Sequence, residues 1–407
     1  MTDFPTRISY AEAAAIIASA AGSRRLPVER CALQRAHGRV LAADVVATIA
    51  QPPFDNAAMD GFALRHADLA GAGETVLELA GEQFAGTSDQ PPVQPGQCVR
   101  ITTGAPMPPG ADTVVMKEDT RVEGGLVRVL VPPSAGRHVR SAGEDTAPGE
   151  LLLRAGDVLT PSRIALCAMQ GLAELEVRRP PTVAVFATGD ELVEPGMALG
   201  PGQIYNSNRE LLMGLLRAEG LEPVAWPTLV DEPAQVESAL RHAGHAFDLV
   251  ITCGGVSAGE KDHLPALMQS QGRVLFWKAR LKPGMPVLLA EGGSLGEALF
   301  LCLPGNPVSV LATWLALGRP LVDALQARAP RPKLHARLVT SWNKRNERLE
   351  FLRGRLIRGE DGVLSVEPNP ADGSNRMRAA ADSDALLVLE EGSREYAAGS
   401  VVEVIAY

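Results

Sequence analysis

The first stretch of the chain places its apolar residues with the period of an amphipathic helix. Ser9 and Glu12 form a capping box, in which each side chain can accept a hydrogen bond from the other residue's backbone N–H. Gly22 is typical of a helix end. The apolar positions at helical spacing between them are Ala13, Ile16, Ile17 and Ala20. The pattern therefore predicts a helix that begins after Ser9 and ends near Gly22.

The pattern changes at about residue 45, where helical periodicity fades and glycine, proline and short β-rich runs take over until residue 149. Those runs are Val76–Leu79, Cys98–Thr102, Thr113–Met116 and Leu126–Val131. Helical character returns at Ser162–Gln170, after Pro161. We therefore expect a β-rich domain of residues 45–149, inserted in a small helical or linker domain of residues 1–44 plus 150–180.

Residues 181–329 repeat a strand followed by a helix. Three short apolar runs are typical of buried parallel strands: Val183–Phe186, Leu249–Cys253 and Leu299–Leu303. Three helix starts follow strands: a capping box at Ser207–Glu210, the stretch Asp231–Pro233 and the pair Asn306-Pro307. The alternation predicts a three-layer α/β domain.

The last segment, residues 330–407, alternates apolar and polar positions and predicts a small β-barrel or β-sandwich. Its clearest runs are Ala336–Thr340, Leu386–Leu389 and Val401–Ile405. The whole chain is therefore expected to be multidomain, of class α/β plus β.

Composition narrows the class of protein. The 407 residues are 46% hydrophobic and carry a net charge of −9, and no Lys/Arg run forms a nucleic-acid patch. The chain has no run of 18 apolar residues, so no membrane span is predicted. The N-terminus lacks the apolar core of a secretory signal. Five scattered cysteines fit reduced, buried thiols in a cytoplasmic protein, and Cys253 is one of these.

Four loops should converge at the carboxyl ends of the α/β strands, where such sheets bind ligands. They are Thr188–Glu191, Asn206–Asn208, Cys253–His263 and Leu303–Ser309. The Gly254-Gly255 pair lets backbone approach an anion, and Asp262 lies beside it. A carboxylate beside a phosphate needs a bridging cation, so Mg²⁺ is expected, with Glu191 and Asp231 as further candidates. All three carboxylates could instead be plain helix-start residues.

Cations stand between the third and fourth of these loops. If this piece is extended, Lys278, Arg280 and Lys282 project to one side at period two. That predicts an anion site in an otherwise acidic chain, although the same residues would also suit a solvated strand face.

The β-rich insert holds three glycine-bounded polar loops, at Pro53–Ala63, Thr102–Pro106 and Arg140–Asp145. Each alone could be a turn.

These loops together resemble the molybdopterin molybdenumtransferase family, which includes MoeA and the gephyrin E domain. Pro53–Ala63 resembles the family's PxFDxSAMDG(Y/F)A signature, and the other matches follow in the family's order. They are Thr102–Pro106, Gly143–Asp145, Thr188–Leu192, Gly254–Asp262, Lys282–Gly284 and Leu303–Ser309. The sequence departs at Asn56-Ala57, and at Gly373–Arg376, before which the family often has a Gln-rich stretch.

The resemblance implies an elongated, L-shaped subunit of a homodimer with a MogA-like α/β domain. It implies that molybdate is inserted into adenylylated molybdopterin, with release of AMP and a requirement for Mg²⁺. Further partners would be the molybdopterin adenylyltransferase and the recipient molybdoenzymes.

The resemblance also implies roles for residues. Asp60, Thr103 and Asp145 would reach the partner's cleft, while Glu191, Asp231 and Asp262 would surround nucleotide and cation. Lys278 and Lys282 would hold molybdate or phosphate, with Ser309, Arg348 and Ser374 as further anion contacts. The remaining substrate contacts in the matched loops are Thr188, Gly254, Gly255, Ser257, Gly259, Pro283, Pro304, Asn306 and Pro307.

Three other functions stay open at this point. The adenylyltransferase uses the α/β domain alone, so the insert and C-terminal domain argue against it. A non-catalytic scaffold would not need the acidic and lysine positions. A nucleotide-processing enzyme of the competence-damage type shares the α/β domain but not the Pro53–Ala63 stretch.

Overall fold

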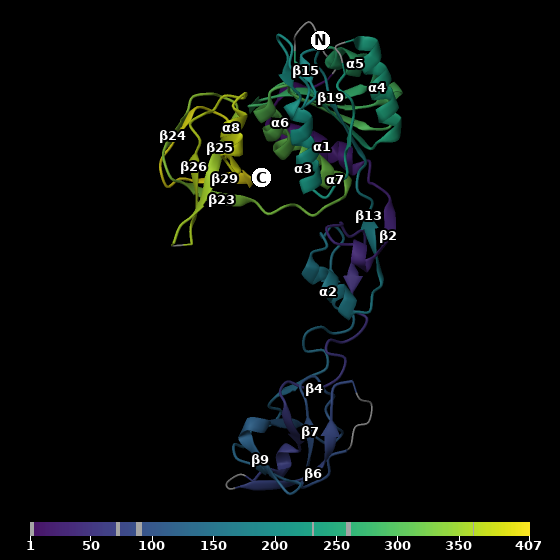
Figure 1. Cartoon of the computed structure of the whole chain (residues 1–407), viewed down its shortest axis with the longest axis vertical. Helices are drawn as coiled ribbons and strands as arrows, with labels where there is room; N and C mark the ends of the chain where they lie inside the picture. The colour runs from purple at the N-terminus through teal and green to yellow at the C-terminus, as the bar shows by residue number, and fades with distance from the viewer. Residues whose placement is uncertain (1–3, 71–73, 87–91, 230–231, 258–261, 361) are drawn as a thin grey trace.

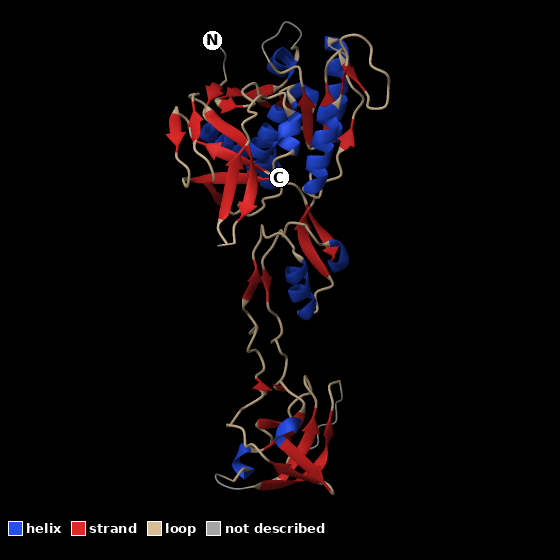
Figure 2. Cartoon of the chain, turned by 60° about the vertical axis from the view of Figure 1, so that its left-hand side comes forward, coloured by secondary structure: helices blue, strands red, loops and turns tan. Residues whose placement is uncertain are grey.

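The protein is an elongated L in which a head of two lobes sits on a long arm (Figures 1 and 2). The computed structural model describes residues 4–407 except 71–73, 87–91, 230–231, 258–261 and 361. The α/β domain and a C-terminal barrel form the head, a small domain follows below it, and a β-rich domain lies at the far end of the arm. The expected multidomain class is confirmed.

The α/β domain is built on a seven-stranded sheet whose central strands are parallel and buried on both faces. This explains the continuous apolar runs, because neither side of such a strand meets water. In spatial order the strands are β1 (Thr6–Ile8), β19 (Arg273–Ala279), β21 (Leu288–Glu291), β22 (Leu299–Leu303), β18 (Leu249–Cys253), β14 (Val183–Ala187) and β17 (Val224–Ala225).

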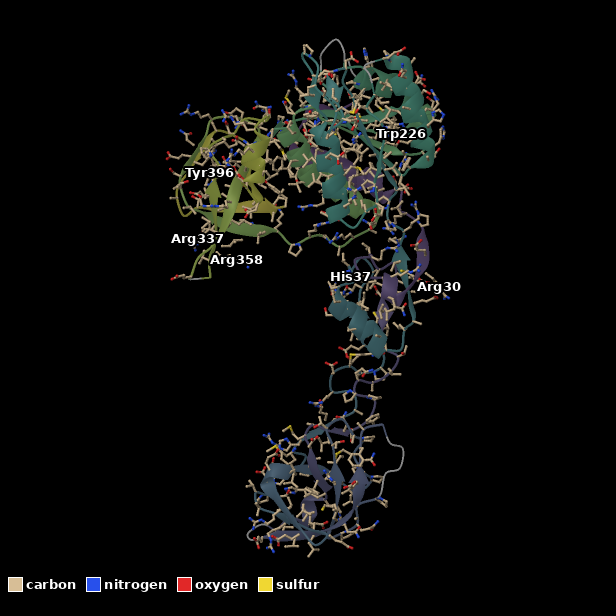
Figure 3. The ribbon with its side chains drawn as sticks, in the orientation of Figure 1. Arg30, His37, Trp226, Arg337, Arg358 and Tyr396 are labelled. Atoms are coloured by element: carbon tan, nitrogen blue, oxygen red, sulfur yellow. The ribbon has the colours of Figure 1, made fainter. Side chains whose placement is uncertain are left out.

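Helices cover both faces of this sheet, which confirms the three layers. Val183 and Val185 belong to the core on one face, whereas Ala184 and Phe186 belong to the core on the other. The first face holds α1 (Tyr10–Gly22), α3 (Ser207–Ala218), α6 (Pro307–Thr313), the π-helical turn η5 (Trp314–Gly318) and α7 (Arg319–Leu325). The second holds α4 (Pro233–Ala246) and α5 (Leu264–Gln271), with η4 (Gly293–Leu295) beside them. Trp226, labelled in Figure 3, stacks on Phe186 with 5.0 Å between ring centroids.

Helix α1 has both hydrogen bonds of the expected capping box and ends at Gly22. Helix α3 does not begin as expected. Its N-cap is Asn206, whose side chain accepts from the backbone N–H of Arg209, so the capping box assigned to Ser207 is wrong.

The N-terminal segment packs with the α/β domain rather than with the helical domain in which we expected it. Strand β1 pairs in parallel with β19, Thr6 opposite Trp277 and Ile8 opposite Ala279. Ala13 and Ile17 of α1 are buried in the core of the same domain. No local pattern indicates this pairing, because the partner strand β19 is so distant along the chain.

The helix Pro307–Leu325 is long and apolar enough to cross a membrane by length and composition. However, 78% of its apolar window is buried inside the structure, as in the core helix of a globular protein. It passes through α6, η5 and α7, and Trp314 at its middle has no exposed surface. The helix contains no long uninterrupted apolar run, because polar residues such as Arg319 and Asp323 interrupt it.

The middle domain has its own small core and is less helical than we expected. Besides α2 (Pro161–Met169) and η1 (Leu33–Arg35), it contains two antiparallel strand pairs. They are β2 (Val28–Ala32) with β13 (Glu174–Arg178), and β3 (Val45–Val46) with β12 (Leu151–Leu153).

The distal domain is β-rich, as the turn-bounded runs predicted. Its sheet has the order β8 (Thr113–Met116), β5 (Gly61–Leu64), β7 (Gln97–Ile101), β6 (Thr75–Gln83), β10 (Leu126–Val129) and β9 (Thr120–Glu123). The pair β4 (Asn56–Ala57) and β11 (Val139–Arg140) stands at the end nearest the arm, and η2 (His66–Asp68) and η3 (Lys117–Asp119) complete the domain.

The C-terminal domain is a closed barrel, which decides between the two expected forms. The strands β25 (Leu349–Arg358), β26 (Leu364–Pro368), β23 (Leu334–Leu338), β29 (Val401–Ala406) and β27 (Ala385–Leu389) form a ring, because β25 and β27 also pair. Strand β20 (Leu281–Lys282), from the middle of the chain, adds to β25. Outside the ring lie β24 (Trp342–Lys344), β28 (Arg394–Tyr396) and α8 (Met377–Ala381).

The arm joins the head through a partly buried ion pair. Both terminal guanidinium nitrogens of Arg179 donate to Asp248, at 2.9 and 2.8 Å, and Thr182 donates to the same carboxylate. Burial alone would raise the pKa of Asp248, but these hydrogen bonds outweigh burial and lower it.

Candidate functional site

A cavity of about 610 Å³ opens at the carboxyl ends of β14, β18 and β22. Thr188, Gly254 and Pro304 directly follow these three strands, and the first residues of α3 and α6 complete the wall. Among the residues expected here, the lining includes Thr188, Glu191, Gly254, Gly255, Ser257, Asp262, Pro304, Asn306 and Pro307. The structure thus brings the four predicted loops together, as the strand-end rule requires.

The Gly254-Gly255 pair is shaped by its approach to Thr188. Both glycines have positive φ, 92° and 64°. A Cβ on Gly254 would lie 2.8 Å from the Thr188 carbonyl oxygen, and one on Gly255 would lie 2.9 Å from the Thr188 hydroxyl. Side chains at both positions are therefore excluded by backbone conformation and by space.

Two buried polar atoms of the cavity wall have no hydrogen-bond partner among the described residues. They are the Thr188 hydroxyl and the Asn208 side-chain carbonyl. The Asn208 amide itself donates to the Gly305 carbonyl at 2.6 Å. Buried polar atoms are nearly always paired in native proteins, so these two are suited to a ligand.

Two carboxylates, Glu191 and Asp262, line the same cavity. Glu191 precedes the short strand β15 (Leu192–Val193), which pairs with β16 (Ile204–Tyr205), so its helix-start interpretation is wrong. Asp262 does not cap α5 either, because His263 holds the N-cap position. Asp231 and Gly259, also expected in the site, lie outside the described residues.

A hydrogen-bonded network braces one wall of the cavity, and sequence reasoning missed it. Arg209 donates to both carboxylate oxygens of Glu194, one at 2.8 Å, and Thr228 donates to Glu194 at 2.9 Å. The bonds from Arg209, then Thr228, lower the pKa of Glu194 despite burial. Asn206 donates to Thr228 at 3.0 Å, which fixes the start of α3. The only sequence signal was the polar cluster before that helix.

Lys278, Arg280 and Lys282 do not form one extended stripe. Lys278 has a φ of 70°, which breaks the period-two alternation, and its ammonium lies 4.1 Å from the Trp277 ring centroid. Arg280 pairs with Glu391 at 3.1 Å. Lys282 lies in β20, which belongs to the barrel sheet. The three cations are thus held by separate partners.

Lys282 lies between two carboxylates of the barrel. Its ammonium is 2.7 Å from Glu350, which is 3% exposed, and 3.0 Å from Asp372, which is 51% exposed. Burial would lower the pKa of Lys282, but the two carboxylates outweigh burial and raise it, so the lysine stays protonated. Arg348 donates to the Leu281 carbonyl at 3.1 Å and so holds the same strand.

The barrel also touches the cavity wall. Asn306 does not cap α6 with its side chain but donates to the Ser374 hydroxyl at 3.1 Å. The Ser374 carbonyl accepts from the backbone N–H of Val308 at 3.2 Å. Ser309 is buried within α6, and Pro283 is half-buried after β20. The Lys282 cluster therefore adjoins the cavity through Asn306.

Cys253 also lines the cavity but is 2% exposed. Burial raises the pKa of its thiol, so it remains protonated, in keeping with a structural role.

Asp60 and Thr103 belong to the distal domain, which stands at the other end of the molecule from the α/β domain (Figure 1). Asp145 lies in the connection between the distal and middle domains, where its backbone N–H donates to the Gln51 carbonyl at 3.0 Å. Asp60 accepts from the Thr103 backbone N–H and hydroxyl, both at 2.8 Å, and these bonds lower its pKa. Asp145 is exposed. Gly61 is required beside them, because a Cβ there would lie 1.9 Å from the Val115 carbonyl oxygen.

Comparisons with known protein families and solved structures show which fold family the chain resembles. Three family models match in chain order: "MoeA N-terminal region (domain I and II)" over residues 8–171, "Probable molybdopterin binding domain" over 184–324, and "MoeA C-terminal region (domain IV)" over 335–407. The crystal structure of a molybdopterin biosynthesis moeA protein from Pyrococcus horikoshii superposes with a TM-score of 0.82 at 28% identity, covering 98% of this chain and 100% of that one. The fold is thus of the MoeA kind.

Sequence relatives identify the family. A molybdopterin molybdenumtransferase of Haemophilus influenzae is 38% identical over 376 residues, covering 91% of this chain and 92% of the relative. Molybdopterin molybdenumtransferase 2 of Mycobacterium tuberculosis is 39% identical over 386 residues, with coverage of 91% and 93%. The chain belongs to the molybdopterin molybdenumtransferase family, a family of transferases of molybdenum cofactor biosynthesis.

Proposed function

We propose that the protein inserts molybdate into adenylylated molybdopterin, with release of AMP and a requirement for Mg²⁺. The observation that carries this proposal is the adjacency of two different sites. The cavity offers carboxylates and unpaired polar atoms, and through Asn306 and Ser374 it adjoins a protonated lysine. A nucleotide and an oxyanion need such neighbouring sites.

The residues present fit a magnesium ion that also has substrate oxygens as ligands. Mg²⁺ is usually held by one or two carboxylates together with phosphates and water, and Glu191 and Asp262 line one cavity. Within the described residues no group of three metal-binding side chains occurs, so the substrate would complete the coordination. Asp231 remains a candidate third carboxylate. When bound, Mg²⁺ would offset the negative charge that develops on the phosphate.

The protein's own groups would act by binding and orientation. The Thr188 hydroxyl and the Asn208 carbonyl would bond to the nucleotide part, with Ser257 and the Gly254-Gly255 turn beside them. Lys282, Arg348 and Ser374 would hold the oxyanion, and Lys278 and Ser309 would contribute from outside this cluster. An oxygen of water or molybdate attacks the adenylate phosphorus, and the phosphoanhydride bond breaks with its electron pair on the molybdopterin phosphate. When water attacks, the adenylate leaves as AMP; when molybdate attacks, water then cleaves the adenylyl–molybdate bond to give AMP and molybdate. The two dithiolene thiols bind molybdenum as one molybdate oxygen leaves with their two protons as water.

We further propose a homodimer in which Asp60, Thr103 and Asp145 of one subunit serve the cleft of the other. These three residues are exposed, and the distal domain, which holds Asp60 and Thr103, stands far from the α/β domain of its own chain. Two hydrogen bonds from Thr103 orient the Asp60 carboxylate in the distal domain. An exposed carboxylate that is already oriented is suited to contact with another subunit. The proposed setting is the cytoplasm, with the adenylyltransferase as donor of substrate and molybdoenzymes as recipients.

The test is AMP release from adenylylated molybdopterin by the purified protein, with and without molybdate and Mg²⁺. Release that depends on both supports the proposal. Asp262→Asn and Lys282→Ala should each abolish it while the oligomer persists. Consumption of ATP with molybdopterin would instead indicate an adenylyltransferase, and no turnover at all would favour a scaffold. Full activity in both variants would overturn the site assignment.

A further inference from the structure

The Lys282 ammonium has a carboxylate on two sides, and the two carboxylates differ in how firmly they are held. We propose that the Asp372 side chain competes with the substrate oxyanion for Lys282, so that Asp372 sets the affinity of the anion site. This inference rests on the proposed function, because it assumes that Lys282 binds the oxyanion. Asp372 would lower the affinity of the site for the oxyanion, whereas the other residues proposed for the site bind the substrate.

Glu350 is the permanent partner of Lys282. Its side chain is 3% exposed and lies 2.7 Å from the ammonium. Its second oxygen accepts from the Asn346 amide at 2.7 Å. A buried carboxylate with both oxygens engaged has no solvated alternative position, because moving it would leave a charge unpaired in the interior. Glu350 therefore keeps Lys282 in place and charged.

Asp372 is the exchangeable partner. Its side chain is 51% exposed and meets Lys282 at 3.0 Å. Water can solvate this carboxylate as soon as it turns away, so leaving the lysine costs little.

The backbone around Asp372 is fixed, which confines any change to its side chain. Arg353 is 2% exposed and donates to the carbonyls of Ala371 and Gly373, the two neighbours of Asp372. The Asn369 side chain accepts from the Ala371 N–H at 3.0 Å. Rotation of the Asp372 side chain can therefore release Lys282 without moving Ser374 or its bond to Asn306.

Charge explains why the exchange is needed. With both carboxylates in contact, the cluster of Lys282, Glu350 and Asp372 carries a net charge of −1 and repels an oxyanion. When Asp372 turns away, Glu350 alone balances the lysine, and the N–H that Asp372 held becomes available. This segment adjoins Gly373–Arg376, where the sequence departs from the family pattern.

The experiment measures molybdate binding to the full-length protein by titration calorimetry. Asp372→Asn and Asp372→Ala should each bind molybdate about fivefold more tightly than wild type, the effect expected from removing one exposed ion pair. Asparagine can accept a hydrogen bond from Lys282, whereas alanine cannot. Equal molybdate affinities in the two variants would therefore assign the effect to the lost negative charge. Thermal unfolding checks that the barrel remains folded.

The matched control is Asp382→Asn in the same domain. Asp382 is 63% exposed and pairs with Arg378 at 3.5 Å, so it loses the same charge away from Lys282. It should bind molybdate as wild type does. Unchanged or weaker binding in both Asp372 variants would overturn the inference. Equal binding by wild type and Lys282→Ala would overturn the oxyanion site of the proposed function itself, which is a separate result.

Discussion

The two regions that hold the candidate site residues are built in opposite ways. In the α/β domain, three strand ends and two helix starts enclose a cavity, and polar groups such as the Thr188 hydroxyl are buried in its wall. In the distal domain, Asp60 and Thr103 are exposed and bonded to each other. The α/β domain can enclose a small ligand, whereas the distal domain exposes an oriented polar group that another molecule or subunit can contact.

This difference teaches that one subunit gathers only part of the predicted site. The arm holds the distal group away from its own cavity, and the Arg179–Asp248 pair ties the arm to the head. The proposed assignment of Asp60 and Thr103 to the site therefore requires a second chain or a large movement of the arm.

The largest expected effect separates these two possibilities. Asp60→Asn and Asp262→Asn should each lower AMP release more than about a hundredfold as pure proteins. If the distal group serves a partner's cavity, coexpressed and separately tagged variants should recover about a quarter of wild-type activity, because half of the dimers are mixed and each has one intact site.

The control for this mixture is the pair Asp60→Asn and Thr103→Ala. Both changes lie in the distal domain, so every cavity in their mixture receives a damaged arm, and no recovery is expected. Recovery equal to that of the first mixture would mean that the distal group does not act as proposed.

A smaller effect tests the buried group of the cavity. Thr188→Val keeps the shape of the side chain but removes its unpaired hydroxyl. The KM for adenylylated molybdopterin should rise about tenfold, the value of one hydrogen bond to a ligand, with the free energy of unfolding nearly unchanged. Thr252→Val is the matched control, since Thr252 is fully buried in β18 and does not line the cavity. Equal kinetics for the two variants would remove Thr188 from the site.

The smallest effect concerns the tie between the two regions. Because the folded-state pKa of Asp248 is lowered, its contribution to stability is present above the unfolded pKa and disappears as the pH falls through the folded one. Asp248→Asn should lower the free energy of unfolding by about 1–2 kcal/mol near pH 6. The difference from wild type should shrink below about pH 4, since the protonated acid resembles asparagine. A difference that stays constant as the pH falls from 6 to well below the unfolded pKa of about 3.9 would contradict this account.

Much of the fold could be predicted from the sequence, because the deciding signals are local. The capping box of α1, the buried strands β14, β18 and β22, and the β-rich insert depend on neighbouring residues. The addition of β20 to the barrel sheet could not be predicted, because two residues from another domain carry no strand signal of their own.

The cavity was predictable for the same reason, since its loops follow recognisable strands. The cation stripe was wrong because the left-handed backbone of Lys278 breaks an alternation that a sequence can only assume. The carboxylate partners of Lys282 were missed because they come from the barrel, so their proximity depends on domain packing. The site assignments in the distal domain stay predictions until the partner is tested.

The pairing of β1 with β19 has a consequence for biosynthesis. Thr6 leaves the ribosome 271 residues before its partner Trp277. At about 5–20 residues per second, the first strand waits roughly 14 to 54 seconds for its place at the sheet edge. During that time the middle and distal domains, which are synthesised in between, can fold on their own cores. An unpaired strand recruits other chains readily, so this interval is when the nascent protein most needs a chaperone.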